Sequence, residues 1–268
     1  FTALYAQKYA ITHLSRTPQK NALSWATFNA TPCIIEKYDY VINLCGESIL
    51  KRWTKKTKER LYSSQIHPTQ TLVNAINTAT KKPQCLINAS AIGYYADDPT
   101  HKPEQAQTEE CPAGNNFMAT LCKDWEDSAK KAQTRVVCLR TGIALEPHHG
   151  FQNLLRWAYK LYIGGHIGTG NQALPWIHIQ DLCRIIDFAL ETQTINGPIN
   201  AVAPTKTSLK TYCKGVAKSL NRPNYMHIPG VLIKLIMGEL GESLLNTPYV
   251  EPGVLENHNF KFSHKNPV

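Results

Sequence analysis

Continuous apolar runs along the chain alternate with stretches in which apolar residues recur every three or four positions. Three of the runs, at residues 38–47, 84–95 and 135–145, predict buried strands. Each begins with apolar residues and changes to small residues in its second half. Two of the amphipathic stretches predict helices, one over about 54–77 with a bend expected at Pro68, and one from 116 or 117 to 131. This alternation of strands and helices predicts an α/β protein with a parallel sheet.

Shorter elements flank this central part. The pattern indicates the end of a helix at 1–9 and then a strand at 9–14. Further along, it predicts a helix at 182–192, a strand at 197–202, helices at 208–220 and 230–245, and a strand-like stretch at 260–262. The Gly-rich loop at 164–170 is not interpreted as a phosphate loop, because it lacks a Gly-Lys-Ser/Thr ending and no strand leads into it.

Small residues stand where the predicted central strands end. Cys45 and Gly46 follow the first strand, and Ala89, Ser90 and Ala91 follow the second. Ligands of doubly wound α/β folds bind at the carboxyl ends of the strands, where small residues let a flat ligand approach the backbone. The sequence therefore predicts a ligand crevice at this edge, and the long polar loop at 97–116 beside it is expected to be functional.

Ser15 and Arg16 follow the strand at 9–14, where NAD-binding folds place an acidic residue on the ribose hydroxyls. An arginine there instead accepts a 2′-phosphate, so NADP is favoured over NAD. The first strand and Gly-rich turn of a dinucleotide-binding fold are not in the sequence, and we expect them to lie before residue 1.

Composition narrows the class of protein. With 43% hydrophobic residues, no signal peptide pattern and no apolar run of membrane-spanning length, the 268-residue chain is expected to be a soluble cytoplasmic protein with no membrane partner. The eight cysteines are scattered without a C-x-x-C pair, which favours reduced thiols over disulfides or a metal site.

The net charge of +9 is spread out except at residues 51–60, which hold six basic residues. Cations at a helix start oppose the helix dipole, so an anionic partner would explain them, although a solvated helix start is the favoured interpretation. No nucleic-acid-binding module accompanies the cluster, and we expect no nucleic-acid partner.

The ordered blocks of the sequence resemble the extended short-chain dehydrogenases/reductases, and more narrowly the bacterial epimerase-family proteins (NAD-dependent epimerase/dehydratase-like, including the cell-division-inhibitor homologues). The resemblance spans nearly the whole chain. It rests on Ser15-Arg16, Val41-Ile42-Asn43-Leu44-Cys45-Gly46-Glu47, Arg52-Trp53-Thr54, Ser90-Ala91-Ile92-Gly93-Tyr94-Tyr95, Leu121-Cys122-Lys123-Asp124-Trp125-Glu126, Leu139-Arg140-Thr141-Gly142, Ile167-Gly168-Thr169-Gly170-Asn171-Gln172, Trp176-Ile177-His178-Ile179 and Met237-Gly238-Glu239.

The resemblance implies a Rossmann-type, doubly wound parallel sheet with a small C-terminal substrate lobe. Residues 1–145 would form the NADP-binding domain, 176–195 would return to it, and 146–268 would supply mainly the lobe. It also implies the cofactor contacts: Ser15 and Arg16 at the adenosine ribose and its 2′-phosphate, Leu44, Cys45 and Gly46 along the adenosine, Ala89 and Ser90 near the nicotinamide, and Arg140, Thr141 and Gly142 in the turn beside it.

Ser90 stands at the position of the superfamily's catalytic serine, but the usual Tyr-x-x-x-Lys pair is replaced by Met118 and Cys122. Methionine cannot carry the proton that accompanies hydride transfer, whereas a tyrosine or carboxylate can. Tyr94, Tyr95 and Glu47 are therefore the alternative catalytic candidates, and Glu47 is equally interpreted as an exposed loop acid.

Two further residues have open roles. Arg140 either anchors a phosphate or substrate or pairs with a buried carboxylate. His178 is expected to be structural, holding strand to helix.

Two functions follow from these expectations. The first is an NADP-dependent epimerase or oxidoreductase acting on a small polar substrate such as a nucleotide sugar, in a monomer or homodimer. The alternative is a non-catalytic NADP(H)-binding sensor or regulatory protein.

Overall fold

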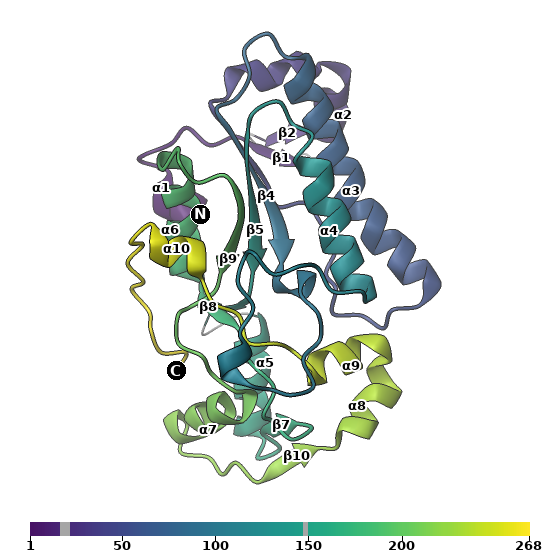
Figure 1. Ribbon diagram of the computed structural model, residues 1–268, viewed down its shortest axis with the longest axis vertical. Coiled ribbons are helices and arrows are strands. Elements are labelled where there is room, and N and C mark those ends of the chain that lie inside the picture. The colour runs from purple at the N-terminus through teal and green to yellow at the C-terminus, as the bar shows by residue number, and fades with distance from the viewer. Residues whose placement is uncertain (17–21, 147–149) are drawn as a thin grey trace.

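The computed structural model describes residues 1–16, 22–146 and 150–268. At its centre lies a four-stranded parallel sheet in the order β3-β4-β5-β9 (Figure 1). Its strands are β3 (Tyr40–Asn43), β4 (Cys85–Ala91), β5 (Arg135–Thr141) and β9 (Gly197–Ala201). The predicted parallel α/β fold is confirmed. Strand β9 also belongs to this sheet, so the part of the chain that returns to it continues past residue 195, where the prediction ended it.

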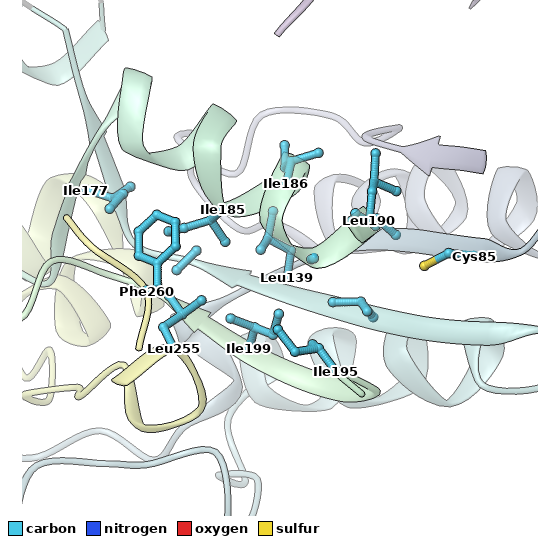
Figure 2. Close-up of a cluster of buried hydrophobic side chains, with 14 residues drawn as sticks. Cys85, Leu139, Ile177, Ile185, Ile186, Leu190, Ile195, Ile199, Leu255 and Phe260 are labelled. Atoms are coloured by element: carbon cyan, nitrogen blue, oxygen red, sulfur yellow. The ribbon is translucent and has the colours of Figure 1, made fainter. Parts of the chain in front are cut away.

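Helices cover both faces of the central sheet. Helices α3 (Lys55–Thr78) and α4 (Phe117–Ala129) lie on one face, while α1 (Thr2–Tyr5), α6 (Ile179–Glu191) and α10 (Gly253–Asn257) lie on the other (Figure 1). Figure 2 shows the second layer, in which Ile185 and Leu190 of α6 and Leu255 of α10 pack against Leu139 of β5. Because both faces are covered, β4 and β5 read as continuous apolar runs in the sequence.

Side-chain caps explain where the long helices begin. Thr54 accepts a hydrogen bond from the backbone N–H of Thr57 at the start of α3, and Asn116 accepts one from Ala119 at the start of α4. These bonds satisfy backbone donors that the first helical turn leaves unpaired. Helix α3 continues through Pro68 to Thr78, so the two predicted helix positions are confirmed.

A small N-terminal unit lies beside the central sheet. Strand β1 (His13–Ser15) pairs in parallel with β2 (Ala22–Ser24), which leads into α2 (Trp25–Ala30) and the 3₁₀ helix η1 (Pro32–Lys37). Ser24 caps α2 by accepting from the N–H of Thr27 at 3.0 Å. Among the described residues, neither β1 nor β2 pairs with a strand of the central sheet.

The C-terminal lobe lies beyond the carboxyl ends of the central strands (Figure 1). Its described residues form two small parallel sheets and four helices. The elements are β6 (Ile143–Leu145) with β8 (Trp176–His178), β7 (Gly165–Ile167) with β10 (Met226–Ile228), α5 (Gly150–Lys160), α7 (Leu209–Ser219), α8 (Gly230–Met237) and α9 (Glu239–Leu245). Between β4 and α4 lie only the 3₁₀ turns η2 (Ile92–Tyr94) and η3 (Pro103–Gln105), as the irregular sequence there indicates.

Several predicted elements differ from the structure. The helix expected over 230–245 is divided at Gly238, whose φ of 63° lies in the left-handed region that ends helices. The loop at 164–170 contains β7, and α6 begins at Ile179 because His178 caps it, three residues before the expected start.

The stretch at 260–262 is not a strand, so that prediction was wrong. Its apolar pattern instead reflects packing, since Phe260 lies in the core against α6. The backbone N–H groups of Ser263 and His264 donate to the buried carboxylate of Asp181, at 3.0 and 2.7 Å. A side-chain anchor therefore holds the C-terminal segment where a strand ladder was expected.

Within the described ranges, no helix is both long and apolar enough to cross a membrane. All eight cysteines are free thiols, and the described residues include no cluster of histidine, cysteine and carboxylate side chains that could hold a metal ion.

Candidate functional site

The carboxyl ends of β3, β4 and β5 bring most of the predicted site residues to one edge. The strand register pairs Asn43 with Asn88 and Ala91 with Thr141, so the three turns lie side by side. Leu44 has 60% of its surface exposed, and Ala89 and Thr141 are half-buried. We call this carboxyl-terminal edge of the central sheet the crevice.

Gly142 is required by close backbone packing at this edge. A Cβ atom there would lie 2.6 Å from the carbonyl oxygen of Pro175 and 2.9 Å from a methyl of Val202. The N–H of Gly142 donates to Ala201, which ties the end of β5 to β9. Any side chain at this position would therefore push apart the strands that shape the crevice.

The turn after β3 is held by a buried asparagine. Asn43 is 1% exposed; its amide donates to Thr69 at 2.8 Å and to the side-chain oxygen of Asn88 at 2.6 Å. Its own side-chain oxygen accepts from the N–H of Cys45 at 3.2 Å. Because a buried amide with all its groups bonded has one orientation, Asn43 sets the path of the Leu44-Cys45-Gly46 turn.

Arg16 lies near the same turn, at the end of β1. Burial raises the pKa of the Cys45 thiol, and the positive charge of Arg16 acts against that rise, which places the guanidinium within electrostatic range of Cys45. Arg16 is exposed to solvent. An accessible cation therefore stands beside the turn predicted to pass the adenosine.

A buried side chain under Gly46 lacks a partner. Gln65 of α3 is 5% exposed, and among the described residues nothing donates a hydrogen bond to its Oε1. Its Cγ lies 3.1 Å from the position a Gly46 Cβ would take. An orphaned buried acceptor at this place marks a point where a bound molecule or water can donate.

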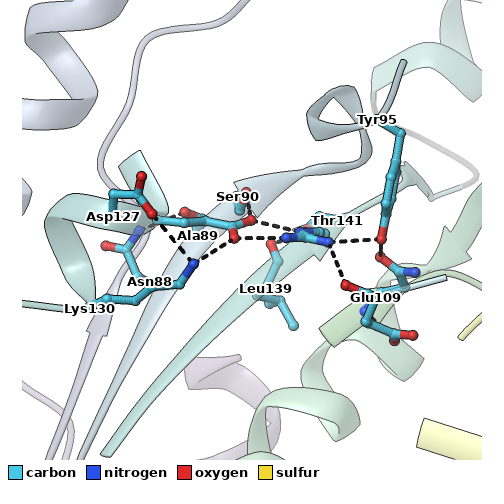
Figure 3. A network of polar contacts seen from close by, with 12 residues as sticks. Asn88, Ala89, Ser90, Tyr95, Glu109, Asp127, Lys130, Leu139 and Thr141 are labelled. Carbon is cyan, nitrogen blue, oxygen red and sulfur yellow. Dashed lines mark hydrogen bonds and ion pairs between the residues drawn. The ribbon is translucent and has the colours of Figure 1, made fainter. Parts of the chain in front are cut away.

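Ser90 belongs to a buried polar network that Figure 3 shows in full. Its hydroxyl donates to Oε1 of Glu126 at 2.8 Å, and the same carboxylate receives Nε and Nη2 of Arg140 at 2.8 and 2.9 Å. Glu126 is 0% exposed and Arg140 2%. Such a bidentate, fully buried pair fixes the direction of the Ser90 hydroxyl.

Of the two roles considered for Arg140, the structure therefore shows the pairing with a buried carboxylate. Its remaining nitrogen, Nη1, donates to the Tyr95 hydroxyl at 3.0 Å and to the carbonyl of Glu109 at 3.4 Å. All three nitrogens of the guanidinium are thus used within the protein. Arg140 joins β5, α4 and the loop before α4.

Tyr94 and Tyr95 have different surroundings. Tyr95 is 2% exposed, its hydroxyl donates to Asn200 at 2.6 Å, and burial raises its pKa to about 12. Tyr94 is half-buried, and the guanidinium carbon of Arg140 lies 3.4 Å from its ring centre. Within the part of the chain that the structure describes, no hydrogen-bond partner engages the Tyr94 hydroxyl, in contrast to that of Tyr95.

Glu47 forms ion pairs with two residues of the basic cluster. Its carboxylate contacts the ammonium of Lys51 and, at 2.7 Å, Nε of Arg60. The hydrogen bond from Lys51 is the main cause that lowers its pKa. Lys58 of the same cluster pairs with Glu239 at 2.6 Å. Several of the cluster's charges are therefore balanced within the protein, which supports its interpretation as a solvated helix start.

Met118 and Cys122, which stand where the superfamily keeps Tyr and Lys, are buried on α4. Burial raises the pKa of the Cys122 thiol to about 12, so it remains protonated at neutral pH. His178 accepts from the N–H of Gln180 as the cap of α6 and stacks on His264 with ring centres 3.7 Å apart. The expectation that His178 is structural is confirmed.

Glu126 was missed as a candidate site residue by sequence reasoning. Its signal is a charged residue on the buried face of α4, four positions after Cys122 and next to Trp125. A carboxylate on an apolar helix face requires a buried partner, and the arginine in the apolar run of β5 supplies it. Asn43 was likewise not predicted as a site residue, although a polar residue within an apolar strand gives a similar signal.

Comparison with known proteins agrees with this architecture. The family model described as "NAD dependent epimerase/dehydratase family" matches residues 2–201. An epimerase family protein of Mycobacterium bovis is 32% identical over 271 residues, covering 98% of this chain and 88% of the relative. One from Staphylococcus haemolyticus is 34% identical over 232 residues, covering 85% of this chain and 76% of the relative.

Solved structures show the same similarity. The crystal structure of the human epimerase family protein SDR39U1 with NADPH has a TM-score of 0.91 at 27% identity, covering 99% of this chain and 91% of the human chain. A nucleoside-diphosphate sugar epimerase from Corynebacterium glutamicum has a TM-score of 0.76 at 29% identity, covering 94% of this chain and 50% of that one. The chain therefore belongs to the NAD-dependent epimerase/dehydratase family and has its Rossmann-type, extended short-chain dehydrogenase/reductase fold.

Proposed function

We propose that this protein binds NADP(H) in the crevice and transfers hydride to or from a small polar substrate such as a nucleotide sugar. The observation that carries the proposal is Arg16, an exposed cation at the end of β1 within electrostatic range of Cys45 in the Leu44-Cys45-Gly46 turn. An arginine there matches the dianionic 2′-phosphate that distinguishes NADP from NAD. The human relative that was crystallised with NADPH supports the same choice of cofactor.

The residues present fit the two ends of such a cofactor. Ser15, Arg16 and the turn held by Asn43 offer a polar, partly cationic cradle for the adenosine ribose and its phosphate. Ala89, Thr141 and Gly142 are half-buried, so part of each remains accessible where a flat ring would lie. When bound, the nicotinamide supplies or accepts the hydride, and the chain's own residues orient the substrate and handle the proton.

Ser90 would orient the reacting oxygen. Because its proton points to Glu126, the lone pairs of Oγ are left to accept a hydrogen bond from a substrate hydroxyl. Arg140 holds Glu126 in place on its other side, so Ser90 keeps this direction as a substrate binds.

Tyr94 is our proposed proton carrier. Its hydroxyl lies outside the buried network, and its ring lies against the Arg140 cation. A general acid–base contributes about 10²- to 10⁴-fold to rate, so Tyr94→Phe should lower turnover by at least about 100-fold while NADPH binding stays unchanged. Tyr95→Phe is the matched control, and it should lower stability more than turnover. Equal turnover in wild type and Tyr94→Phe would exclude Tyr94.

Calorimetric titration with NADPH and NADH tests the cofactor assignment. A charge-assisted contact to the 2′-phosphate is worth about 1.5–3 kcal/mol, so the wild type should favour NADPH by about 10- to 100-fold. Arg16→Ala should abolish the preference. Lys81→Ala removes one charge from a side chain that is 71% exposed and lies near Asp39, just before the amino end of β3, and should leave the preference intact. Equal affinities in the wild type, or a preference that survives Arg16→Ala, would contradict the proposal.

A second function, a non-catalytic NADP(H)-binding regulator, is favoured by one observation. Met118 has no ionisable group, and burial keeps the Cys122 thiol protonated at neutral pH, so neither buried side chain can relay a proton as the usual Tyr/Lys pair does. If this function is the correct one, NADPH bound by the protein is oxidised by no carbonyl compound in a broad panel, and the yield of a partner in pull-down depends on NADPH. Turnover with any member of the panel would exclude the non-catalytic function and support the enzymatic one.

A further inference from the structure

Large apolar side chains are exposed in two segments of the C-terminal lobe. The first segment, 154–163, covers most of α5 and the turn after it, and the second, 225–236, covers β10 and most of α8. We call the exposed apolar side chains of these two segments the apolar strip. Contiguous apolar patches of more than a few hundred Å² on a protein surface mark sites of interaction.

The two segments of the strip meet in space. Strands β7 and β10 pair in parallel, with Gly165 opposite Met226. The Tyr225 hydroxyl donates to the carbonyl oxygen of Tyr162 at 3.5 Å. The strip is therefore continuous from α5 through β10 to α8, and these strands and α8 lie at the end of the molecule farthest from β1 and β2 (Figure 1).

The side chains of the strip protrude into solvent. On α8, Ile233 is buried, but Val231 is 80% exposed and Leu235 70%. On α5, Leu154 is 71% exposed, and Trp157 lies three positions later on the same side of the helix. Protruding apolar side chains suit a fluid apolar phase, which takes them up without a pocket of matching shape.

The parts of the lobe that carry the strip hold only basic charges. Residues 150–175 contain two lysines and arginines and residues 205–238 contain six, eight in total, with no aspartate or glutamate in either range. Among the described residues, Lys206 pairs with Glu251 and Lys234 with Glu242, both carboxylates from outside these ranges. The surface around the strip is therefore strongly positive.

Two of the cations stand directly at the strip. The ammonium of Lys160 lies 5.2 Å from a ring centre of Trp157, and the guanidinium carbon of Arg222 lies 4.5 Å from the ring centre of Tyr162. Apolar and positive groups are thus interleaved on one surface.

Helix α7 adds a row of cations beside β7. Lys210, Lys214 and Lys218 follow one another at intervals of four residues, so they share one side of the helix, and all three are exposed. Burial and then the charge of Lys210 lower the pKa of His166 on β7. Lys210 is therefore within electrostatic range of the strand that pairs with β10.

The charge of this surface argues against a second copy of the chain as the occupant. A symmetric pair would set the strip against the same strip and bring its cations together. An anionic lipid surface instead offers phosphates to the cations and acyl chains to the apolar side chains. Aromatic side chains such as Trp157 and Tyr225 are enriched at that boundary.

We propose that the apolar strip docks this protein on an anionic lipid surface, with its apolar side chains among the headgroups and its lysines and arginines on the phosphates. The proposal does not rest on the NADP(H) function.

The expectation of no membrane partner rested on the lack of an apolar run long enough to span a bilayer. Docking on one leaflet needs no such run, because only the exposed side of a segment enters the boundary between headgroups and acyl chains. The strip is brought together from two segments, so no single stretch of the sequence shows it.

Co-sedimentation with vesicles tests the proposal. One set of vesicles is phosphatidylcholine alone, and the other contains about 30% phosphatidylglycerol as the anionic lipid. We expect saturable binding to the anionic vesicles and at least tenfold weaker binding to the neutral ones. A protein that stays in solution with both sets, or binds both equally, would overturn the proposal.

Paired variants place the contact on the apolar part of the strip. Leu235→Ser should weaken binding to the anionic vesicles at least fivefold, because its side chain would enter the lipid. Leu4→Ser is the matched control, since Leu4 is exposed on α1 outside the strip, and it should leave binding unchanged. Equal binding by the two variants would contradict the assignment.

The cations are tested in the same way. Lys214→Gln with Lys218→Gln should weaken binding to the anionic vesicles at least tenfold. Lys55→Gln with Lys56→Gln removes the same charge from the exposed start of α3 and should change binding less than twofold. An equal loss in both double variants would mean that net charge alone attracts the vesicles, and the proposal would be wrong.

Tryptophan fluorescence gives an independent measurement. All five tryptophans lie in the described part of the chain, and Trp157, at 56%, is the exposed one. The wild type should therefore show a blue shift of emission when anionic vesicles are added, and Trp157→Phe should show none. A blue shift that persists in Trp157→Phe would contradict contact at α5.

Two other occupants give different results. A dimer that forms at increasing protein concentration and dissociates in Leu235→Ser would assign the strip to a second copy. A labelled acidic amphipathic peptide that binds the wild type while vesicles do not would assign it to a protein partner. Either result would overturn the lipid proposal.

Discussion

The ion pair between Glu126 and Arg140 offers a direct test of the buried network. Glu126→Leu leaves the Arg140 guanidinium, 2% exposed, without its two hydrogen bonds of 2.8 and 2.9 Å to the carboxylate. Removing one partner of a buried pair costs about 3–5 kcal/mol, because the other charge remains desolvated. We therefore expect Glu126→Leu to lower the free energy of unfolding by about 3–5 kcal/mol.

The double variant Glu126→Leu, Arg140→Met removes both charges. Apolar replacements of similar volume no longer leave a buried charge, although Ser90 and Tyr95 each lose one hydrogen bond. Unmet hydrogen-bonding groups of this kind cost about 1–3 kcal/mol each, and Tyr95 keeps its bond to Asn200. We expect the double variant to be more stable than Glu126→Leu by at least about 1 kcal/mol, with a coupling energy of about 2 kcal/mol or more.

Urea unfolding followed by circular dichroism measures the stability of four proteins: the wild type, Glu126→Leu, Arg140→Met and the double variant. The slope of the free energy with urea should stay constant, so that midpoints report stability. Lys130→Ala is the control, because the Lys130 side chain is 45% exposed and its ammonium lies 3.7 Å from Glu126, and it should change stability by less than about 0.5 kcal/mol. Additivity of the two single variants within about 0.5 kcal/mol would refute the argument, since it would mean that the residues do not act as a pair.

Three further predictions follow from single positions. Burial alone would raise the pKa of Asp181, but backbone and side-chain hydrogen bonds hold it below its usual value, so its stabilising effect is present at neutral pH and lost as the pH falls below about 4. Asp181→Asn should therefore lower the urea midpoint at pH 7 and flatten its decline toward pH 3, and an unchanged acid profile would contradict this. Gly142→Ala should cost about 2 kcal/mol or more by urea unfolding, against less than about 1 kcal/mol for Gly46→Ala, because the neighbour at Gly46 is a flexible side chain 3.1 Å away and the one at Gly142 is backbone at 2.6 Å. A thiol reagent at pH 8 should modify exposed Cys33 within minutes and leave buried Cys122 intact until urea is added, and early labelling of Cys122 in peptide mapping would argue against its burial.

The crevice was largely predictable because local features define it. Apolar runs ending in small residues predicted β4 and β5, and the parallel order then places Ala89 and Thr141 at one edge. The caps at Thr54 and Asn116 are equally local, since a side chain three residues before an N–H can satisfy it wherever the helix lies.

Residues that depend on distant partners were not predictable. Glu126 and Arg140 are 14 positions apart, and nothing local shows that each is the other's partner. Likewise, Phe260 and Phe262 have the pattern of a strand, but the chain after them is held by Asp181, more than 80 positions away.

The sequence by itself determined the fold class, the strands and helices of the central layer, and the sheet edge at which we propose that the cofactor binds, because these follow from periodicity and from residue size. Only the tertiary structure decided that Tyr95 and not Tyr94 belongs to the buried network, and that Arg140 pairs with Glu126. Those properties arise when segments far apart in the chain meet, since burial and pairing belong to the packed arrangement and not to any one segment.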